Sequence, residues 1–269
     1  MASDTKRKNN FEVLSQLRLF DDTFMSIAFN DQIKETKFLI DTITGMNVTV
    51  IEAKTQDFIP TLLKHEARLD IFARDSDGRV YHFEIQRARD GATEKRARFT
   101  AAVVDTKLLG KGDDYTCLPD RYTIFITETD FFGKGLPLYH VENRIRELGY
   151  EPFEDGGHII YVNGAYRDTD NPIGALMHDF SCVNPSDMIN EVLRDRVREL
   201  KEETGGRKTM CAIVDNLIKD GIKEDRLENA KKMIADGSIP IEKIAYLQGL
   251  PLSEVQKLAE EMKKQPKAE

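Results

Sequence analysis

The sequence predicts an α/β fold in which a mixed sheet with an antiparallel hairpin is flanked by helices and followed by an all-helical C-terminal region. Three observations predict it. Residues 68–87 have the pattern of two strands joined by a tight turn. Residues 121–127 form a near-continuous apolar run, which is typical of a strand buried on both faces. From residue 185 onward, the apolar residues recur only at helical spacing.

The other elements of the sheet-bearing part are predicted in chain order as a helix, a strand, a helix and two strands: residues 11–45 with Gly45 as the stop, 48–53, 90–109, 136–141 and 158–163. Ser186 is expected to cap the first helix of the C-terminal series. We therefore expect three parts: a disordered N-terminus over 1–10, a core over 11–205 and a helical module over 206–269.

The composition is typical of a globular protein, with 269 residues of which 40% are hydrophobic and 32% charged. No run of about 18 apolar residues is present, so no membrane partner is expected. The polar first ten residues do not resemble a secretion signal. The 3 cysteines are widely spaced and match neither a disulfide framework nor a zinc motif, which predicts a cytoplasmic protein.

The net charge of −8 argues against a protein that coats nucleic acid, because such proteins are usually basic. It does not exclude a nuclease. A nuclease needs only a local basic rim at its active site, and a bound metal ion adds positive charge there.

The predicted hairpin brings acidic and polar side chains together. Asp70 lies on its first strand, and Glu84 and Gln86 project from one face of the second, because residues two apart on a strand share a face. Residues 75–78 supply the turn, in which Gly78 can adopt a positive φ. Two carboxylates and an amide in this arrangement can hold a hard divalent cation through oxygen atoms.

The alternative is that this face of the hairpin is merely solvated. Two details favour a cation-binding site over a solvated face. Glu84 lies inside the apolar run 80–85, and the opposite face of that strand carries only Tyr81, Phe83 and Ile85. This pattern indicates a central strand, where an isolated carboxylate would be costly.

The order of elements resembles that of the PD-(D/E)XK nuclease superfamily, and most closely its Rpn-type (recombination-promoting nuclease) transposase branch. The resemblance covers roughly residues 20–205. The segments that carry it are 24–30, 69–71, 83–86, 95–99, 122–127, 132–135 and 177–180. It implies a restriction-endonuclease-like sheet and a metal-dependent DNA endonuclease that hydrolyses phosphodiester bonds.

By this resemblance, Asp70 and Glu84 would bind Mg²⁺ or Mn²⁺, and the backbone carbonyl of Ile85 would complete the site. Gln86 stands where the superfamily usually has lysine, and it can orient a water molecule or a phosphate oxygen without supplying a charge. A third acidic ligand would be Glu35 or Asp31. The alternative function is a weak or inactive nuclease-fold protein that acts as a nucleic-acid- or protein-binding module.

Four other features have two readings each. Arg96 and Arg98 either contact phosphates or form surface ion pairs, with Glu94 among the partners. His82 is expected to be packed or hydrogen-bonded rather than a ligand, because Mg²⁺ prefers oxygen. His178 and Asp179 have the composition of a catalytic dyad, but no partner serine or cysteine is arranged around them, so a structural hydrogen bond is expected. Residues 241–262 resemble a helix-turn-helix, but the second helix is acidic, which favours protein contact and possible homo-oligomer formation over DNA reading.

Overall fold

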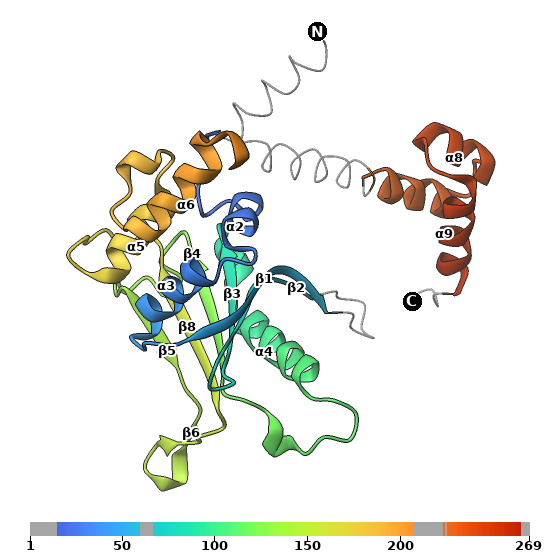
Figure 1. The fold of residues 1–269 in the computed structure, drawn as a ribbon. Coiled ribbons are helices and arrows are strands. Elements are labelled where there is room, and N and C mark those ends of the chain that lie inside the picture. Colours follow the sequence, from blue (N-terminus) through green and yellow to red (C-terminus); the bar gives the residue numbers. More distant parts are fainter. Residues whose placement is uncertain (1–14, 60–66, 207–222, 224, 265–269) are drawn as a thin grey trace. The chain divides into compact units, whose positions relative to one another are not determined.

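The computed structural model describes residues 15–59, 67–206, 223 and 225–264 (Figure 1). The chain divides into two compact units, Met1–Met210 and Cys211–Glu269. Within the described ranges, no helix is both long enough and apolar enough to cross a membrane.

A six-stranded mixed sheet forms the centre of the first unit, as predicted for the fold class. Its strand order is β1-β2-β3-β4-β8-β5. The first three strands are antiparallel, β3, β4 and β8 are parallel, and β5 is antiparallel to β8. The strands are β1 (Val50–Ile59), β2 (Ala67–Asp75), β3 (Val80–Gln86), β4 (Arg121–Thr127), β8 (Gly157–Asn163) and β5 (Leu138–Val141).

Helix α4 (Glu94–Leu108) covers one face of the sheet, and Figure 1 shows the other helices of this unit on the opposite side. Val103 and Val104 of α4 pack with Phe72 and Val80 in one buried cluster. On the other side, α2 and α3 contact β1, and α3 also contacts α5 and α6. These helices are α2 (Asp22–Phe29), α3 (Ile33–Thr44), α5 (Pro172–Ser181) and α6 (Glu191–Glu202).

The single helix predicted over residues 11–45 is wrong. Residues 16–21 are not helical, and beyond them the chain forms two helices, α2 and α3, because it turns between Phe29 and Ile33, where Asp31 has a φ of 57°. The N–H of Asp31 donates to the carbonyl of Ala53 on β1, so contact with the sheet interrupts the helix. Gly45 does end α3, in the left-handed conformation with a φ of 72°.

The predicted cap at Ser186 is also wrong. Ser186 lies in a 3-10 turn, η4 (Pro185–Asp187), and α6 begins only at Glu191. The start of α6 is held instead by Asp179 of α5, whose carboxylate accepts the backbone N–H groups of Ile189 and Asn190. A long-range tether thus replaces the local cap that the sequence predicted.

The sequence pattern missed several short elements. A small two-stranded sheet pairs β6 (Arg144–Ile145) with β7 (Glu151–Pro152). The 3-10 turns η1 (Arg89–Ala92), η2 (Tyr115–Cys117) and η3 (Arg146–Leu148) connect larger elements. Such segments are too short to show a hydrophobic period.

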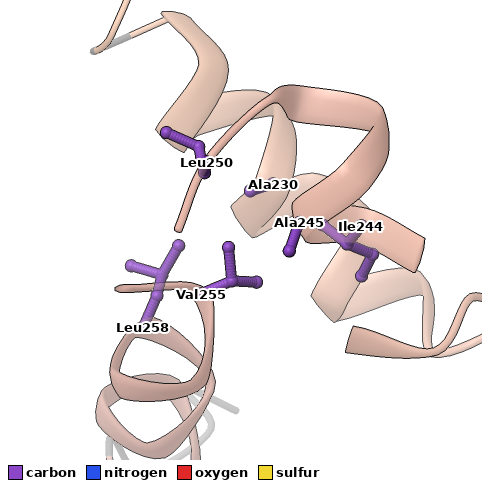
Figure 2. Close-up of a cluster of buried hydrophobic side chains, with 6 residues drawn as sticks. All are labelled: Ala230, Ile244, Ala245, Leu250, Val255 and Leu258. Atoms are coloured by element: carbon purple, nitrogen blue, oxygen red, sulfur yellow. The ribbon is translucent and has the colours of Figure 1, made fainter. Parts of the chain in front are cut away.

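The second unit is helical in its described part. Residues 225–236 form a helix, followed by α8 (Ile241–Gln248) and α9 (Leu252–Lys264), with Gly249 at a φ of 60° in the turn between them. Figure 2 shows the buried cluster that joins these helices: Ala230, Ile244, Ala245, Leu250, Val255 and Leu258. Residues 207–222, which fall within the predicted helical module, lie outside the described residues.

Candidate functional site

The strands β2 and β3 separate at Asp70 and Glu84. Their pairing runs from Arg74↔Val80 to Ile71↔Phe83, and one further step in this register sets Asp70 opposite Glu84. The ladder stops there, while β2 stays paired with β1 as far as Ala67. Oδ2 of Asp70 accepts the N–H of Ile85 at 2.8 Å, so a carboxylate satisfies an N–H donor just beyond the last residue pair of the β2–β3 ladder.

Glu84 is buried but not isolated. Its side chain is only 3% exposed, and Oε2 accepts hydrogen bonds from Nη2 of Arg96 at 2.9 Å and Nε2 of Gln86 at 3.2 Å. Nε2 of His82 lies 3.4 Å from Oε1. Burial by itself would raise the pKa of Glu84, but His82 and Arg96 outweigh it and hold that pKa below its usual value of 4.5.

Gln86 lies on the same face of β3 and is fitted closely against the following turn. A Cβ atom added at Gly91 would stand 1.9 Å from Oε1 of Gln86, so the absence of a side chain at Gly91 makes room for the amide. The backbone carbonyl of Gln86 accepts the N–H of Glu128, which ties β3 to the end of β4.

Arg96 and Arg98 have different surroundings on α4. Arg96 follows Thr93, whose hydroxyl caps the helix by accepting the N–H of Arg96. The ion pair of Arg96 is with Glu84, a partner that neither sequence reading anticipated. Arg98 is exposed and forms no hydrogen bond or ion pair with a residue in the described ranges.

The two candidates for a third acidic ligand lie on and just before α3. Glu35 is buried, and Asp31 is exposed beside β1. Within the described part of the chain, neither joins Asp70 and Glu84 in a set of three ligand atoms that lie within 4.8 Å of one another.

Asp70, Glu84 and the carbonyl of Ile85 offer only oxygen atoms at the fork. This donor set fits a hard divalent cation such as Mg²⁺ or Mn²⁺. The residues present are therefore compatible with the metal that the hairpin pattern suggested.

A charged network beside the fork was not predicted. Arg87, which follows Gln86, donates to Asp21 at 2.8 Å and to Glu128 at 3.1 Å, and Arg18 donates to Glu128 at 2.8 Å. Burial by itself would raise the pKa of Glu128, but the hydrogen bonds and charges of Arg18 and Arg87 together outweigh it, so that pKa lies below its usual value. The partners lie 41 to 110 residues apart in sequence, and no local pattern signals such contacts.

His178 and Asp179 form the structural contact expected from the sequence. Asp179 is fully buried and accepts three N–H groups from Ile189 and Asn190, with His178 Nδ1 at 3.3 Å. The sulfur of Cys182 lies near the His178 ring, but burial together with Asp179 and Asp187 raises the pKa of this thiol to about 11. A thiol that stays protonated is a poor nucleophile.

The comparisons with known proteins agree with this arrangement. Residues 32–164 match the model of the PD-(D/E)XK nuclease family transposases. The match contains the whole β2–β3 fork, α4 and β8. This part of the chain therefore belongs to the PD-(D/E)XK nuclease family transposases, and its mixed sheet has a restriction-endonuclease-like fold. A search of curated proteins and a search of solved structures gave no match.

Proposed function

We propose that this protein is a metal-dependent DNA endonuclease that hydrolyses phosphodiester bonds. The observation that carries the proposal is the meeting of Asp70 and Glu84 where β2 and β3 separate, inside the part that matches a nuclease family. A divalent ion supplies a Lewis acid and a metal-activated water molecule when it is bound.

The residues of the fork have distinct roles in this proposal. Asp70, Glu84 and the carbonyl of Ile85 hold Mg²⁺ or Mn²⁺. Gln86, whose Nε2 already reaches Glu84 Oε2, orients the attacking water or a phosphate oxygen. Because glutamine is neutral, Gln86 does not replace the positive charge of the usual lysine.

Positive charge at the site comes from α4 instead. Arg96 contacts Glu84 and is nearly half exposed, so its guanidinium can turn toward a phosphate when a metal ion takes its place on the carboxylate. Arg98, exposed on the same helix, provides a second phosphate contact.

The test is cleavage of supercoiled plasmid with Mg²⁺ or Mn²⁺ and with chelator. We expect nicking by the wild-type protein and none by Asp70→Asn or Glu84→Gln, with both variants folded by circular dichroism. Wild-type cleavage that survives both substitutions would exclude this site.

A wild-type protein that binds DNA but never cleaves it would favour the alternative function. In that case the chain is a nuclease-fold protein that acts as a nucleic-acid- or protein-binding module. The missing lysine and the net charge of −8 are the observations on that side. Gel-shift experiments with increasing salt separate the two outcomes, since binding without cleavage is measured directly.

We also propose that the C-terminal helices support self-association rather than catalysis. Tyr246 is 85% exposed and Leu247 is 52% exposed on α8. The Tyr246→Ser/Leu247→Ser variant should lower the mass in solution measured by light scattering, whereas Glu260→Ser on α9 should not. A wild-type protein that is monomeric at high concentration would contradict this proposal.

We propose a cytoplasmic location, because the described cysteines are free thiols. Cys117 and Cys182 are both free, and free thiols persist in reducing compartments. Thiol trapping in fresh lysate should find Cys117 reduced.

A further inference from the structure

Three potential metal ligands meet where α5 ends. His178 and Asp179 lie in the last turn of this helix, and Cys182 is the residue at its C-terminal cap. Residues four apart on a helix are neighbours, so the ring of His178 lies beside the thiol of Cys182. One ligand atom from each of the three residues lies within 4.8 Å of the other two, and the described ranges contain no other such set of His, Cys, Asp and Glu.

The separations within this set fit a tetrahedral metal ion. Nδ1 of His178 lies 3.3 Å from Oδ1 of Asp179 and 3.6 Å from Sγ of Cys182. Metal bonds of about 2.1 Å to nitrogen and oxygen that meet at about 109° place those two atoms about 3.4 Å apart. A bond of about 2.3 Å to sulfur gives about 3.6 Å between nitrogen and sulfur. Both observed distances therefore suit one ion bound between the three atoms.

Asp179 supplies a buried negative charge. It is fully buried, and within the described ranges no Lys or Arg forms an ion pair with it, so His178 is its one possible cationic partner there. Its Oδ1 accepts the N–H of Ile189, whereas Oδ2 accepts both N–H groups of Asn190. A carboxylate has about four lone-pair positions, so Oδ1 keeps one for a cation. Because an unpaired buried charge is costly, the site favours a bound cation.

The donor atoms indicate which cation fits. An imidazole nitrogen, a thiolate and a carboxylate oxygen are the ligands of Zn²⁺, whereas Mg²⁺ and Ca²⁺ are held by oxygen atoms. The His178 side chain is 37% exposed and Cys182 is half-buried, so a metal ion and a water molecule can reach the set from solvent. The fork of β2 and β3 offers only oxygen atoms and therefore has a different metal preference.

We propose that His178, Asp179 and Cys182 form a zinc site in which Nδ1, Oδ1 and Sγ bind one Zn²⁺ and a water molecule takes the fourth position. The thiol proton leaves to solvent when the ion binds, because the thiolate is the form that binds metal. Asp179 also holds the start of α6, so the ion stabilises the junction of α5 and α6. The site is separate from the fork and does not depend on the proposed nuclease chemistry.

The first test is the absorption spectrum of Co²⁺ bound to the full chain in the presence of a phosphine reductant. Co²⁺ substitutes for Zn²⁺, and a cysteine ligand gives a thiolate-to-metal charge-transfer band in the near ultraviolet. The wild-type protein should show this band and Cys182→Ser should lack it. Cys117→Ser is the matched control and should keep the band, because Cys117 is an exposed free thiol elsewhere. No band in the wild type, or an equal band in Cys182→Ser, would overturn the inference.

The second test measures Zn²⁺ affinity by competition with a chromophoric chelator. Cys182→Ser and His178→Gln should each weaken binding about 100-fold or more, since losing a ligand costs more than losing a group that only orients one. His140→Gln, at an exposed position on β5, should bind as the wild type does, and excess Mg²⁺ should not displace Zn²⁺. Wild-type affinity in Cys182→Ser or His178→Gln would overturn the inference.

Melting temperatures connect the ion to the fold. Zn²⁺ should raise the melting temperature of the wild-type protein and raise that of Cys182→Ser much less. Asp70→Asn, which lacks a carboxylate of the fork, should keep both the Co²⁺ band and the stabilisation by Zn²⁺. A protein that never cleaves DNA but passes these tests would contradict only the proposed function, whereas loss of the band in Asp70→Asn would overturn the zinc site.

Discussion

Nη2 of Arg96 donates to Oε2 of Glu84 across 2.9 Å, so a side chain from α4 neutralises the buried carboxylate at the fork of β2 and β3. The Glu84 side chain is 3% exposed and that of Arg96 is 45% exposed. The arginine can therefore leave toward solvent while the carboxylate cannot. A metal ion that reaches Glu84 competes with a positive charge that is already in place.

Removing this competitor should tighten metal binding. For Arg96→Gln we expect Mn²⁺ affinity without DNA to rise roughly 2- to 5-fold, which matches about 0.4–1 kcal/mol for an ion pair in which the arginine is nearly half exposed. Arg98→Gln is the matched control, and its Mn²⁺ affinity should not change. Isothermal titration measures both. Weaker Mn²⁺ binding by Arg96→Gln would mean that Arg96 supports the metal site rather than competing for it.

The same substitution should change the response to acid. Because Arg96 helps hold the pKa of Glu84 below 4.5, the stability that Glu84 contributes is present above pH 4.5 and is lost as the pH falls through the folded-state pKa. The Arg96→Gln variant should have a lower melting temperature than the wild type at pH 7. Its melting temperature should fall less than that of the wild type between pH 7 and pH 4. An equal acid-induced loss in wild type and variant would contradict this.

Gly91→Ala should reproduce the effect of removing the Gln86 amide. The new Cβ would stand 1.9 Å from Oε1 of Gln86, so the amide must leave its position. We expect Gln86→Ala and Gly91→Ala each to slow cleavage about 10- to 1000-fold, the size typical of losing one oriented donor.

A double-mutant cycle checks this mechanism. Gly91→Ala should add little in the Gln86→Ala background, since the group it displaces is already gone. Gly205→Ala is the control, because a Cβ at Gly205 meets nothing within 4 Å. Fully additive losses would show that Gly91 acts independently of Gln86.

Asp179→Asn should destabilise the first unit without touching metal binding at the fork. Its carboxylate accepts three N–H groups from Ile189 and Asn190, and an amide would direct its own N–H₂ group at some of them. We expect a loss of about 3 kcal/mol in the free energy of unfolding. Asp187→Asn, at an exposed position, should cost less than about 0.5 kcal/mol. Urea unfolding measures the free energy of unfolding of both variants. Equal losses would contradict the role of Asp179 in holding the start of α6.

Cys182 should resist alkylation while Cys117 reacts. With a pKa of about 11, the thiol of Cys182 is ionised in roughly one molecule per thousand at pH 8. Cys117 is exposed. Mass spectrometry of peptides after brief iodoacetamide treatment should find Cys117 labelled and Cys182 unlabelled, with both labelled after denaturation. Early labelling of Cys182 would show that its thiol is accessible and ionised.

The sequence by itself determined the features that depend on neighbouring residues. The period of two along β3 places Glu84 and Gln86 on one face, and the turn at Gly78, with a φ of 86°, fixes the hairpin register that sets Asp70 opposite Glu84. The apolar run of β4 and the stop at Gly45 are local in the same way.

Only the tertiary structure decided which charges meet. The partners Arg96 and Glu84 are 12 residues apart, Arg87 and Asp21 are 66 apart, and their contacts depend on how α4 and the N-terminal segment pack against the sheet. Within the described ranges the ring of His82 has no hydrogen-bond partner, and this has the same origin, because the alternation along β3 shows which face His82 occupies but not what lies opposite its nitrogens. Periodicity assigns a side chain to a face, whereas its partners are set by packing between elements distant in sequence.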